Sequence, residues 1–174
     1  LIEYNMSEKS KFFKNTFENI NIEQGSLLKS ITIQKNKSNG YFYKNISGTQ
    51  DYNSSYQSFI LSSGLKFNKI EINMNLEKEN STCYILSGLS LGKDEHQEIK
   101  TRINHLAPNC KSYQKIKNVL ENDSNGVYQG KIFVKDIAQK TDAYQLSKAL
   151  ILNDQAGFNA KPELEIYADD VCLL

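Results

Sequence analysis

NGVYQGKIFVKDIAQKTDAYQLSKALILNDQAGFNAKPELEIYADDVC, residues 125–172, holds the clearest strand pattern of the chain. In its first part, GVYQGKIFVK at 126–135, the alternate positions Tyr128, Ile132 and Val134 fall on one side of an extended backbone. Alternation of this kind is typical of a β-strand with one apolar face. The segment is therefore predicted to be a strand that packs one face on a core.

Two further strands are predicted in the same stretch. ALIL at 149–152 is a short continuous apolar run, as in a strand that is covered on both faces. In ELEIY at 163–167, Leu164 and Ile166 alternate with glutamates. Pro162 stands at the entrance of this strand, where the missing N–H costs the hydrogen-bond ladder least. Three strands so close together indicate a β-rich domain.

The rest of the chain repeats this alternation of short apolar runs and turns rich in Gly, Asn, Ser or Lys. Successive runs start roughly 11 to 22 residues apart, most often about 15, which favours a sandwich, a barrel or a coiled solenoid. Residues 142–150 are also compatible with one or more helical turns, and Phe13, Phe17 and Ile20 have helical spacing, although we predict a strand there. The predicted strands are 16–22, 27–34, 40–44, 56–61, 69–76, 82–89, 98–104, 112–120, 127–135, 149–152 and 164–167.

At 174 residues, the chain is long enough for one domain with a sizeable core. Its 21 basic and 20 acidic residues leave a formal charge of +1, so no global field favours nucleic acid or an anionic membrane as a partner. Cys83, Cys110 and Cys172 lie far apart without metal-ligand spacing, so we expect reduced thiols rather than disulfides or a zinc site. The sequence shows neither an apolar run of transmembrane length nor a signal-peptide pattern, and a cytoplasmic protein is expected.

Four pieces of the quoted stretch, GVYQGKIFV, AQKTDAYQ, ALIL and KPELEIYADDV, resemble in order and spacing the core domain of the SufB/SufD family, from the SUF system of iron–sulfur cluster assembly. The preceding segment, HLAPNCKSYQKIKNVL at 105–120, is more similar to the SufD branch than to the SufB branch. The resemblance covers residues 11–174 and leaves 1–10 as an irregular N-terminal segment. It implies an all-β fold, the right-handed parallel β-helix, which we prefer to a sandwich on this ground.

The resemblance also implies a scaffold subunit that is not itself an enzyme. Members of the family pair with a SufB-like subunit, or with themselves, through C-terminal strands that match residues 149–171, and they work with a SufC-like ATPase. The sequence has no GxxxxGK[ST] phosphate-binding loop, so ATP hydrolysis is assigned to that ATPase. The ATPase docks on a helical subdomain after the core, which we expect to be missing from a chain that ends at Leu174. We therefore expect this polypeptide to bind no SufC-like partner.

A transient iron–sulfur cluster is the cargo that the resemblance implies, while no cofactor is expected in this chain itself. Cys172 follows Asp169, Asp170 and Val171 one position earlier than the cysteine of the family motif D-D-V-x-C-x-H-G-A-T, and the motif's histidine is missing. A shift of one residue turns a strand side chain to the opposite face. Cys172 is either a cluster ligand, as thiolate chemistry allows, or a free thiol at the chain terminus.

Other candidate site residues also follow from the resemblance. His105 and Cys110 match the family segment H-x-x-P-x-C-x-S and are candidate metal ligands; the alternative is a loop histidine and a buried cysteine that packs as a small apolar residue. A set of polar residues forms the second group of candidates: these side chains either line the partner interface or cap turn amides. Its members are Gln139, Thr141, Asp142, Gln145, Asp169 and Asp170.

Two other functions are left open by the sequence. Parallel β-helices also serve as carbohydrate-active enzymes that use acidic groups for calcium or acid–base chemistry, for which Asp169 and Asp170 are the candidates. The second alternative is a split-gene remnant without a function of its own.

Overall fold

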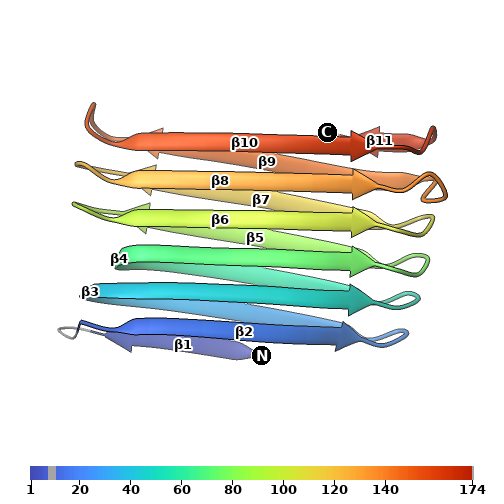
Figure 1. The fold of residues 1–174 in the computed structure, drawn as a ribbon, viewed down its shortest axis with the longest axis horizontal. Coiled ribbons are helices and arrows are strands. Elements are labelled where there is room, and N and C mark those ends of the chain that lie inside the picture. The colour runs from blue at the N-terminus through green and yellow to red at the C-terminus, as the bar shows by residue number, and fades with distance from the viewer. Residues whose placement is uncertain (8–10, 174) are drawn as a thin grey trace.

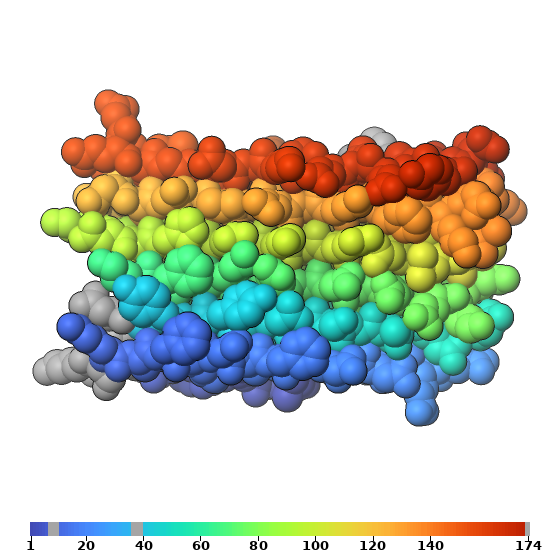
Figure 2. Space-filling model, viewed as in Figure 1, coloured from blue at the N-terminus to red at the C-terminus, as the bar shows by residue number. Residues whose placement is uncertain are grey.

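The computed structural model describes residues 1–7 and 11–173, and all the regular structure in these ranges is β-strand. The strands stack as successive layers from the N-terminal to the C-terminal end (Figures 1 and 2). They are β1 (Ile2–Ser7), β2 (Phe13–Ile22), β3 (Leu27–Gln50), β4 (Ser55–Leu76), β5 (Thr82–Leu91), β6 (His96–His105), β7 (Lys111–Leu120), β8 (Asn125–Val134), β9 (Thr141–Ile151), β10 (Gly157–Ile166) and β11 (Val171–Leu173).

Two parallel sheets face each other across the core. In the view of Figure 1, the rear sheet contains β1, the first parts of β3 and β4, and β5, β7, β9 and β11. The front sheet contains β2, the second parts of β3 and β4, and β6, β8 and β10. The long strand β4 crosses from the rear sheet to the front sheet at Gly64. The φ of this residue is 78°, a value that glycine adopts without strain.

The chain winds around a common axis with two strands per coil. Leu27 pairs with Ser55, Ser55 with Thr82, Thr82 with Lys111 and Lys111 with Asp142, so one coil takes 27 to 31 residues. Front strands run one way, rear strands run the other, and the path rises as a right-handed coil (Figure 1). The predicted right-handed parallel β-helix is confirmed, and the spacing of about 15 residues in the sequence corresponds to half a coil.

The core lies between the sheets, where alternate side chains of each strand stack in rows. Ile103 and Ile132 are fully buried in one such row, and burying a side chain of this size contributes about 2 kcal/mol. Phe13 and Phe17 point outward and are exposed while Ile20 points inward, as a strand requires and a helix does not allow. This row of the front sheet is Ile20, Gly48, Met74, Ile103, Ile132 and Leu164.

In one turn of each coil, a residue adopts the left-handed backbone conformation with positive φ. These turns stack into a ladder. The φ values lie between 54° and 69°. Each backbone N–H donates to a carbonyl in the corresponding turn of the next coil, over 2.6 to 3.4 Å. Asparagine tolerates this backbone better than most residues, which explains its use at three of the positions. The ladder residues are Gly25, Asn53, Asn80, Asn109 and Lys140.

The N-terminal end of the solenoid is closed by charged side chains. Lys44 is 1% exposed, points into the core and lies 2.5 Å from Glu3 and 2.7 Å from Glu18. Lys14 contacts Glu3 at 3.2 Å. Burial alone raises the pKa of Glu3, but hydrogen bonds from Lys44, Asn5 and Lys14 and the charge of Lys44 outweigh it and lower this pKa to about 2. A polar first coil shields the apolar rows behind it from water.

Several sequence-based expectations were wrong at the two ends. Residues 1–10 were expected to be irregular, but Ile2–Ser7 forms β1, because its backbone completes the ladder of β3. The helical alternative for 142–150 is excluded by β9, which pairs with β7 along its whole length. The run 149–152 was expected to be covered on both faces, yet Leu150 and Leu152 are 59% and 55% exposed.

Two smaller corrections concern strand bounds. Segments 27–34 and 40–44 form one strand, β3, as 56–61 and 69–76 form β4. Pro162 lies within β10 rather than at its entrance. Within the described part of the chain, β10 is an edge strand, which is where a proline is tolerated in a sheet.

Among residues 1–7 and 11–173, no helix is long and apolar enough to cross a membrane.

Candidate functional site

The last coil, formed by β9, β10 and β11, presents core-type rows to the surface. Leu164 and Ile166 of β10 lie in register with Ile132 and Val134 of β8. The two β8 residues are 1% and 0% exposed, whereas Leu164 and Ile166 are 57% and 36% exposed. In the described structure no further strand covers them, and the outer backbone groups of β10 are available for pairing. The last described coil therefore presents a strand edge and apolar side chains on its surface.

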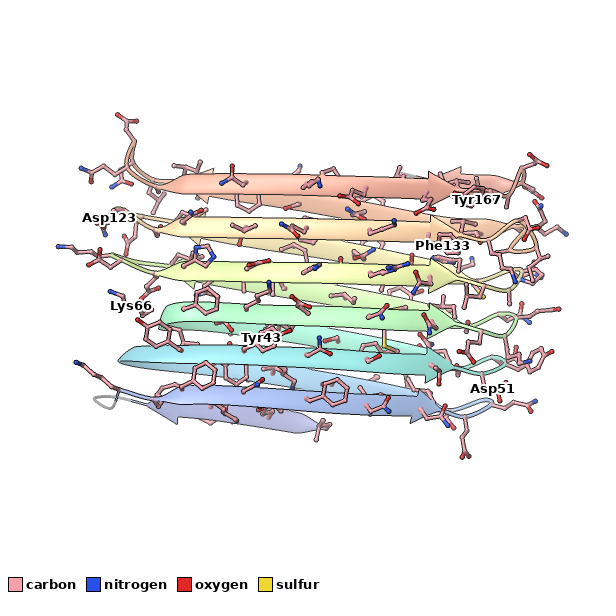
Figure 3. All side chains as sticks on the ribbon, viewed as in Figure 1. Tyr43, Asp51, Lys66, Asp123, Phe133 and Tyr167 are labelled. Atoms are coloured by element: carbon pink, nitrogen blue, oxygen red, sulfur yellow. The ribbon has the colours of Figure 1, made fainter. Side chains whose placement is uncertain are left out.

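Aromatic contacts and an ion pair hold this coil in place. Tyr167, just after β10, packs on Phe133 of β8 with ring centroids 5.9 Å apart (Figure 3). Its hydroxyl donates to Glu165 over 2.9 Å. Lys131 lies 2.5 Å from the same carboxylate. The exposed rows are thus presented by an ordered strand that several contacts tie to the previous coil.

Cys172 lies on the outer side of the last rear strand. It is exposed, and its backbone is in register with Asp142 of β9. Its neighbour Val171 packs on a small cluster that contains Ala143, so the two side chains point to opposite faces of β11. The Asp142 carboxylate also lies 3.8 Å from the ammonium group of Lys111. The thiol is accessible from solvent and points away from the core.

The polar segment before β9 forms the last described rung of the turn ladder. Gln139 donates from Nε2 to the carbonyl of Asp136 at 2.8 Å and accepts from the N–H of Asp170 at 2.9 Å. The Thr141 hydroxyl donates to the carbonyl of Ala138 at 2.8 Å. These bonds favour turn capping for Gln139 and Thr141.

The other predicted interface residues lie at the last two coils. Gln145 is half-buried and donates to the carbonyl of Gly130 at 3.4 Å. Asp142, Asp169 and Asp170 are exposed. The structure thus brings all six predicted residues to the C-terminal end of the solenoid, and their contact with a partner stays a prediction.

His105 and Cys110 flank one corner of the core, and each is buried with its own partner. His105 Nε2 lies 2.9 Å from the Ser112 hydroxyl, while its buried Nδ1 has no hydrogen-bond partner. Cys110 Sγ lies 3.2 Å from the Ser81 hydroxyl and 3.3 Å from the carbonyl of Lys78. Burial raises the pKa of the Cys110 thiol, which opposes thiolate formation.

The turn ladder explains why a cysteine stands at position 110. Four of the five ladder residues, all except Gly25, are followed by Ser54, Ser81, Cys110 and Thr141, and each of these four side chains contacts a carbonyl of its own turn. Cys110 thus takes the place of a hydroxyl in a repeated turn. Among the residues that the structure describes, no group of three or more His, Cys, Asp or Glu side chains is arranged to hold a metal ion.

The buried His105 gives a testable pH dependence. Burial lowers its pKa from 6.5 to about 4, so the folded protein holds the neutral ring where the unfolded chain binds a proton. The stability contributed by the neutral ring is complete above pH 6.5 and is lost as the pH falls toward 4, by up to about 1.4 kcal/mol per pH unit. We expect His105→Gln to remove this part of the pH dependence. The stability gap between the parent and His105→Gln, measured by urea unfolding at pH 7, 6 and 5, should shift steadily; a constant gap would contradict the assignment.

Comparison with known proteins agrees with the fold. A family model described as "SUF system FeS cluster assembly, SufBD core domain" matches residues 1–173. An iron–sulfur cluster assembly SufBD family protein of Synechocystis sp. is 27% identical over 169 residues, which cover 94% of this chain and 36% of that protein. The iron–sulfur cluster assembly protein SufD of Escherichia coli is 36% identical over 96 residues, which cover 55% of this chain and 23% of that protein.

A plant relative shows the same relation in length. The chloroplastic protein ABCI7 of Arabidopsis thaliana is 24% identical over 165 residues, which cover 94% of this chain and 35% of that protein. The chain spans about a third of the length of the relatives that it matches along most of its own length. With a family model that matches almost every residue and a two-stranded right-handed coil of the kind the resemblance implies, the chain belongs to the SufB/SufD core domain family of the SUF iron–sulfur cluster assembly system.

Proposed function

We propose that this chain is the β-helix core of a SufD-type scaffold subunit, which helps to assemble iron–sulfur clusters in the cytoplasm and catalyses no reaction itself. Family membership supports the pathway. The match to SufD of Escherichia coli supports the SufD branch. Any ATP hydrolysis belongs to a SufC-like ATPase that acts with the longer members of the family.

The observation that carries this proposal is the exposed last coil. A scaffold subunit needs a surface that binds another subunit in a fixed orientation. The edge of β10 offers unpaired backbone groups beside exposed apolar side chains, which is the combination that strand-to-strand association uses. We assign the partner surface to residues 149–171, and the partner is a SufB-like subunit or a second copy of this chain.

The cluster is cargo of the assembled complex, and Cys172 is the ligand that this chain has in an accessible position. A single thiolate does not hold a cluster, because such clusters are ligated by several Cys or His side chains. The remaining ligands must come from the partner, which would place the cluster beside the last coil. His105 and Cys110 are buried with partners of their own and are less suited to the task.

Charging the last coil should weaken self-association. Because Leu164 and Ile166 are exposed members of apolar rows, we expect Leu164→Lys/Ile166→Lys to keep the fold and to weaken the dimer at least about tenfold, since buried unpaired charges are costly. Analytical ultracentrifugation over a series of high micromolar concentrations measures the effect. The matched control is Phe13→Lys/Phe17→Lys, two exposed apolar positions at the opposite end.

The control variant should dimerise as the parent does. A parent chain that sediments as a monomer at every concentration, while circular dichroism reports a folded β-rich protein, would contradict self-association through this surface and leave the SufB-like subunit as its partner. Equal weakening in both variants would point to association elsewhere and would also contradict it.

A further inference from the structure

The outer face of the rear sheet concentrates positive charge that the total charge of +1 conceals. Along the part of the chain that the structure describes, one carboxylate, Asp142, points outward from this sheet, and it lies 3.8 Å from Lys111. The outward lysines of the rear sheet are Lys29, Lys35, Lys111, Lys115, Lys117 and Lys148. We call this surface the rear face.

The same face exposes large apolar side chains at its N-terminal half. Phe59, Leu61 and Leu86 are 41%, 47% and 37% exposed, and Ile2 and Tyr4 of β1 are more exposed still. A shallow hollow lies between two of the outward rows. It is lined by Lys29, Ile31, Gln57, Phe59, Tyr84 and Leu86, with buried serines at its floor.

Two neighbouring outward rows of the rear face are apolar over the first coils and carry lysines in the later ones. The row Ile31, Phe59 and Leu86 continues as Lys115 and then as Leu146. The next row runs from Ile33 through Leu61 and Gly88 to Lys117 and Lys148. A ligand that lies along the axis would therefore meet apolar surface over the first coils and positive charge over the later ones.

We propose that the rear face binds an acidic amphipathic helix of a partner protein, laid along the solenoid axis. Neighbouring strands are about 4.8 Å apart, and residues three or four apart on a helix advance by about 4.5 to 6 Å, so one helix face places one side chain over each coil. The distance from β1 to β9 is about 24 Å, which a helix of about 16 residues spans. Its apolar residues would occupy the hollow, and its acidic residues would meet Lys115, Lys117 and Lys148.

The charges and the aromatic geometry favour this partner over three others. A second copy of the chain would bring one lysine-rich face against another, which is repulsive. Single-stranded nucleic acid needs open aromatic faces, but Tyr113 stacks on Tyr144 with ring centroids 4.6 Å apart and packs against a tilted Tyr84 at 6.3 Å. A membrane surface favours basic residues around an apolar centre, whereas here Lys115, Lys117 and Lys148 gather at one end of the apolar rows. The surface is distinct from the last coil, and the inference is independent of the function proposed above.

The test uses the full chain and a fluorescent 18-residue helical peptide with leucines along one face and glutamates in its C-terminal half. Fluorescence anisotropy compares it with a peptide that has lysine in place of glutamate, with vesicles that contain phosphatidylserine, and with oligothymidine. We expect binding of the acidic peptide that weakens at least about tenfold for Lys115→Glu/Lys117→Glu/Lys148→Glu. The matched control, Lys78→Glu/Lys93→Glu/Lys100→Glu, reverses three exposed lysines elsewhere and should change the affinity less than about twofold.

Two further measurements use the parent chain alone. Added salt should weaken the complex, because exposed charges are screened over about 10 Å at 0.1 M. Mass spectrometry after acetylation should show that the peptide protects Lys115, Lys117 and Lys148 but not Lys93 or Lys100. No binding at the highest soluble peptide concentration, equal binding of the lysine peptide, equal loss in both triple variants, or tighter binding of vesicles or oligothymidine would each overturn the proposal.

Discussion

Replacing Lys44 with methionine is expected to lower the free energy of unfolding by about 3 kcal/mol. Lys44 is 1% exposed and holds Glu3 and Glu18 at 2.5 and 2.7 Å. Methionine fills a similar volume but leaves both carboxylates at the edge of the core without their shared cation. A charge left unpaired in a low-dielectric site costs far more than the intact group contributes.

A triple variant separates the lost pairing from a packing defect. In Glu3→Gln/Glu18→Gln/Lys44→Met all three charges are gone, so most of the loss should be regained, to within about 1 kcal/mol of the parent. Urea unfolding at pH 7 measures both variants. If Lys44→Met costs less than about 1 kcal/mol, or if the triple variant is no more stable than the single one, the ion-pair account of the first coil is wrong.

Acid should act on the same cluster. The pKa of Glu3 is lowered to about 2 from a model-peptide value of 4.5, so its ion pair contributes stability that is complete above pH 4.5 and is lost as the pH falls toward 2. Lys44→Met removes the pair, and the stability difference between parent and variant should therefore shrink over that range.

Truncating Ile103 to alanine is expected to destabilise the chain by about 2 to 5 kcal/mol, because the side chain is fully buried in a central coil and its loss leaves a cavity. Each coil is stabilised by its two neighbours, so a defect in the middle weakens the contact between the halves of the solenoid. We expect urea unfolding of Ile103→Ala to show a lower midpoint and a broader transition.

The same inward row supplies the control. Leu164 occupies the equivalent position in the last coil but is 57% exposed, so Leu164→Ala should cost less than about 1 kcal/mol in a monomeric sample. Equal costs at the two positions would contradict the exposure of Leu164 in the last coil.

The sequence was a good guide to the fold wherever rows of the core are apolar. In β8, Tyr128, Ile132 and Val134 fall on one side of the strand, and the strand lies where the pattern predicts it. In β9 the inward positions are Ala143, Gln145 and Ser147, which are small or polar, so the alternation is invisible and helical turns are an equal match. The segment is a strand because it pairs with β7, whose residues are distant from it in the sequence.

The candidate site was harder to predict because its features depend on the coil as a whole. Cys110 resembles a metal ligand in the sequence, whereas its equivalence to Ser54 and Ser81 emerges once turns 27 to 31 residues apart are aligned by strand pairing. Leu164 and Ile166 were predicted as strand residues, but their exposure depends on where the described coils end in space. The lysines of the rear face are scattered along the sequence and gather through the same stacking.

The most direct test of the central claim is co-assembly with the SufB-like subunit from the same organism. Purified chain and subunit are mixed without oxygen, and the mass of the complex is measured by sedimentation. We expect a one-to-one complex that Leu164→Lys/Ile166→Lys prevents and Phe13→Lys/Phe17→Lys leaves intact. If the folded parent chain and the SufB-like subunit sediment separately at high micromolar concentration, or if the Leu164→Lys/Ile166→Lys variant assembles as well as the parent, the last coil is not the surface through which this chain joins the scaffold.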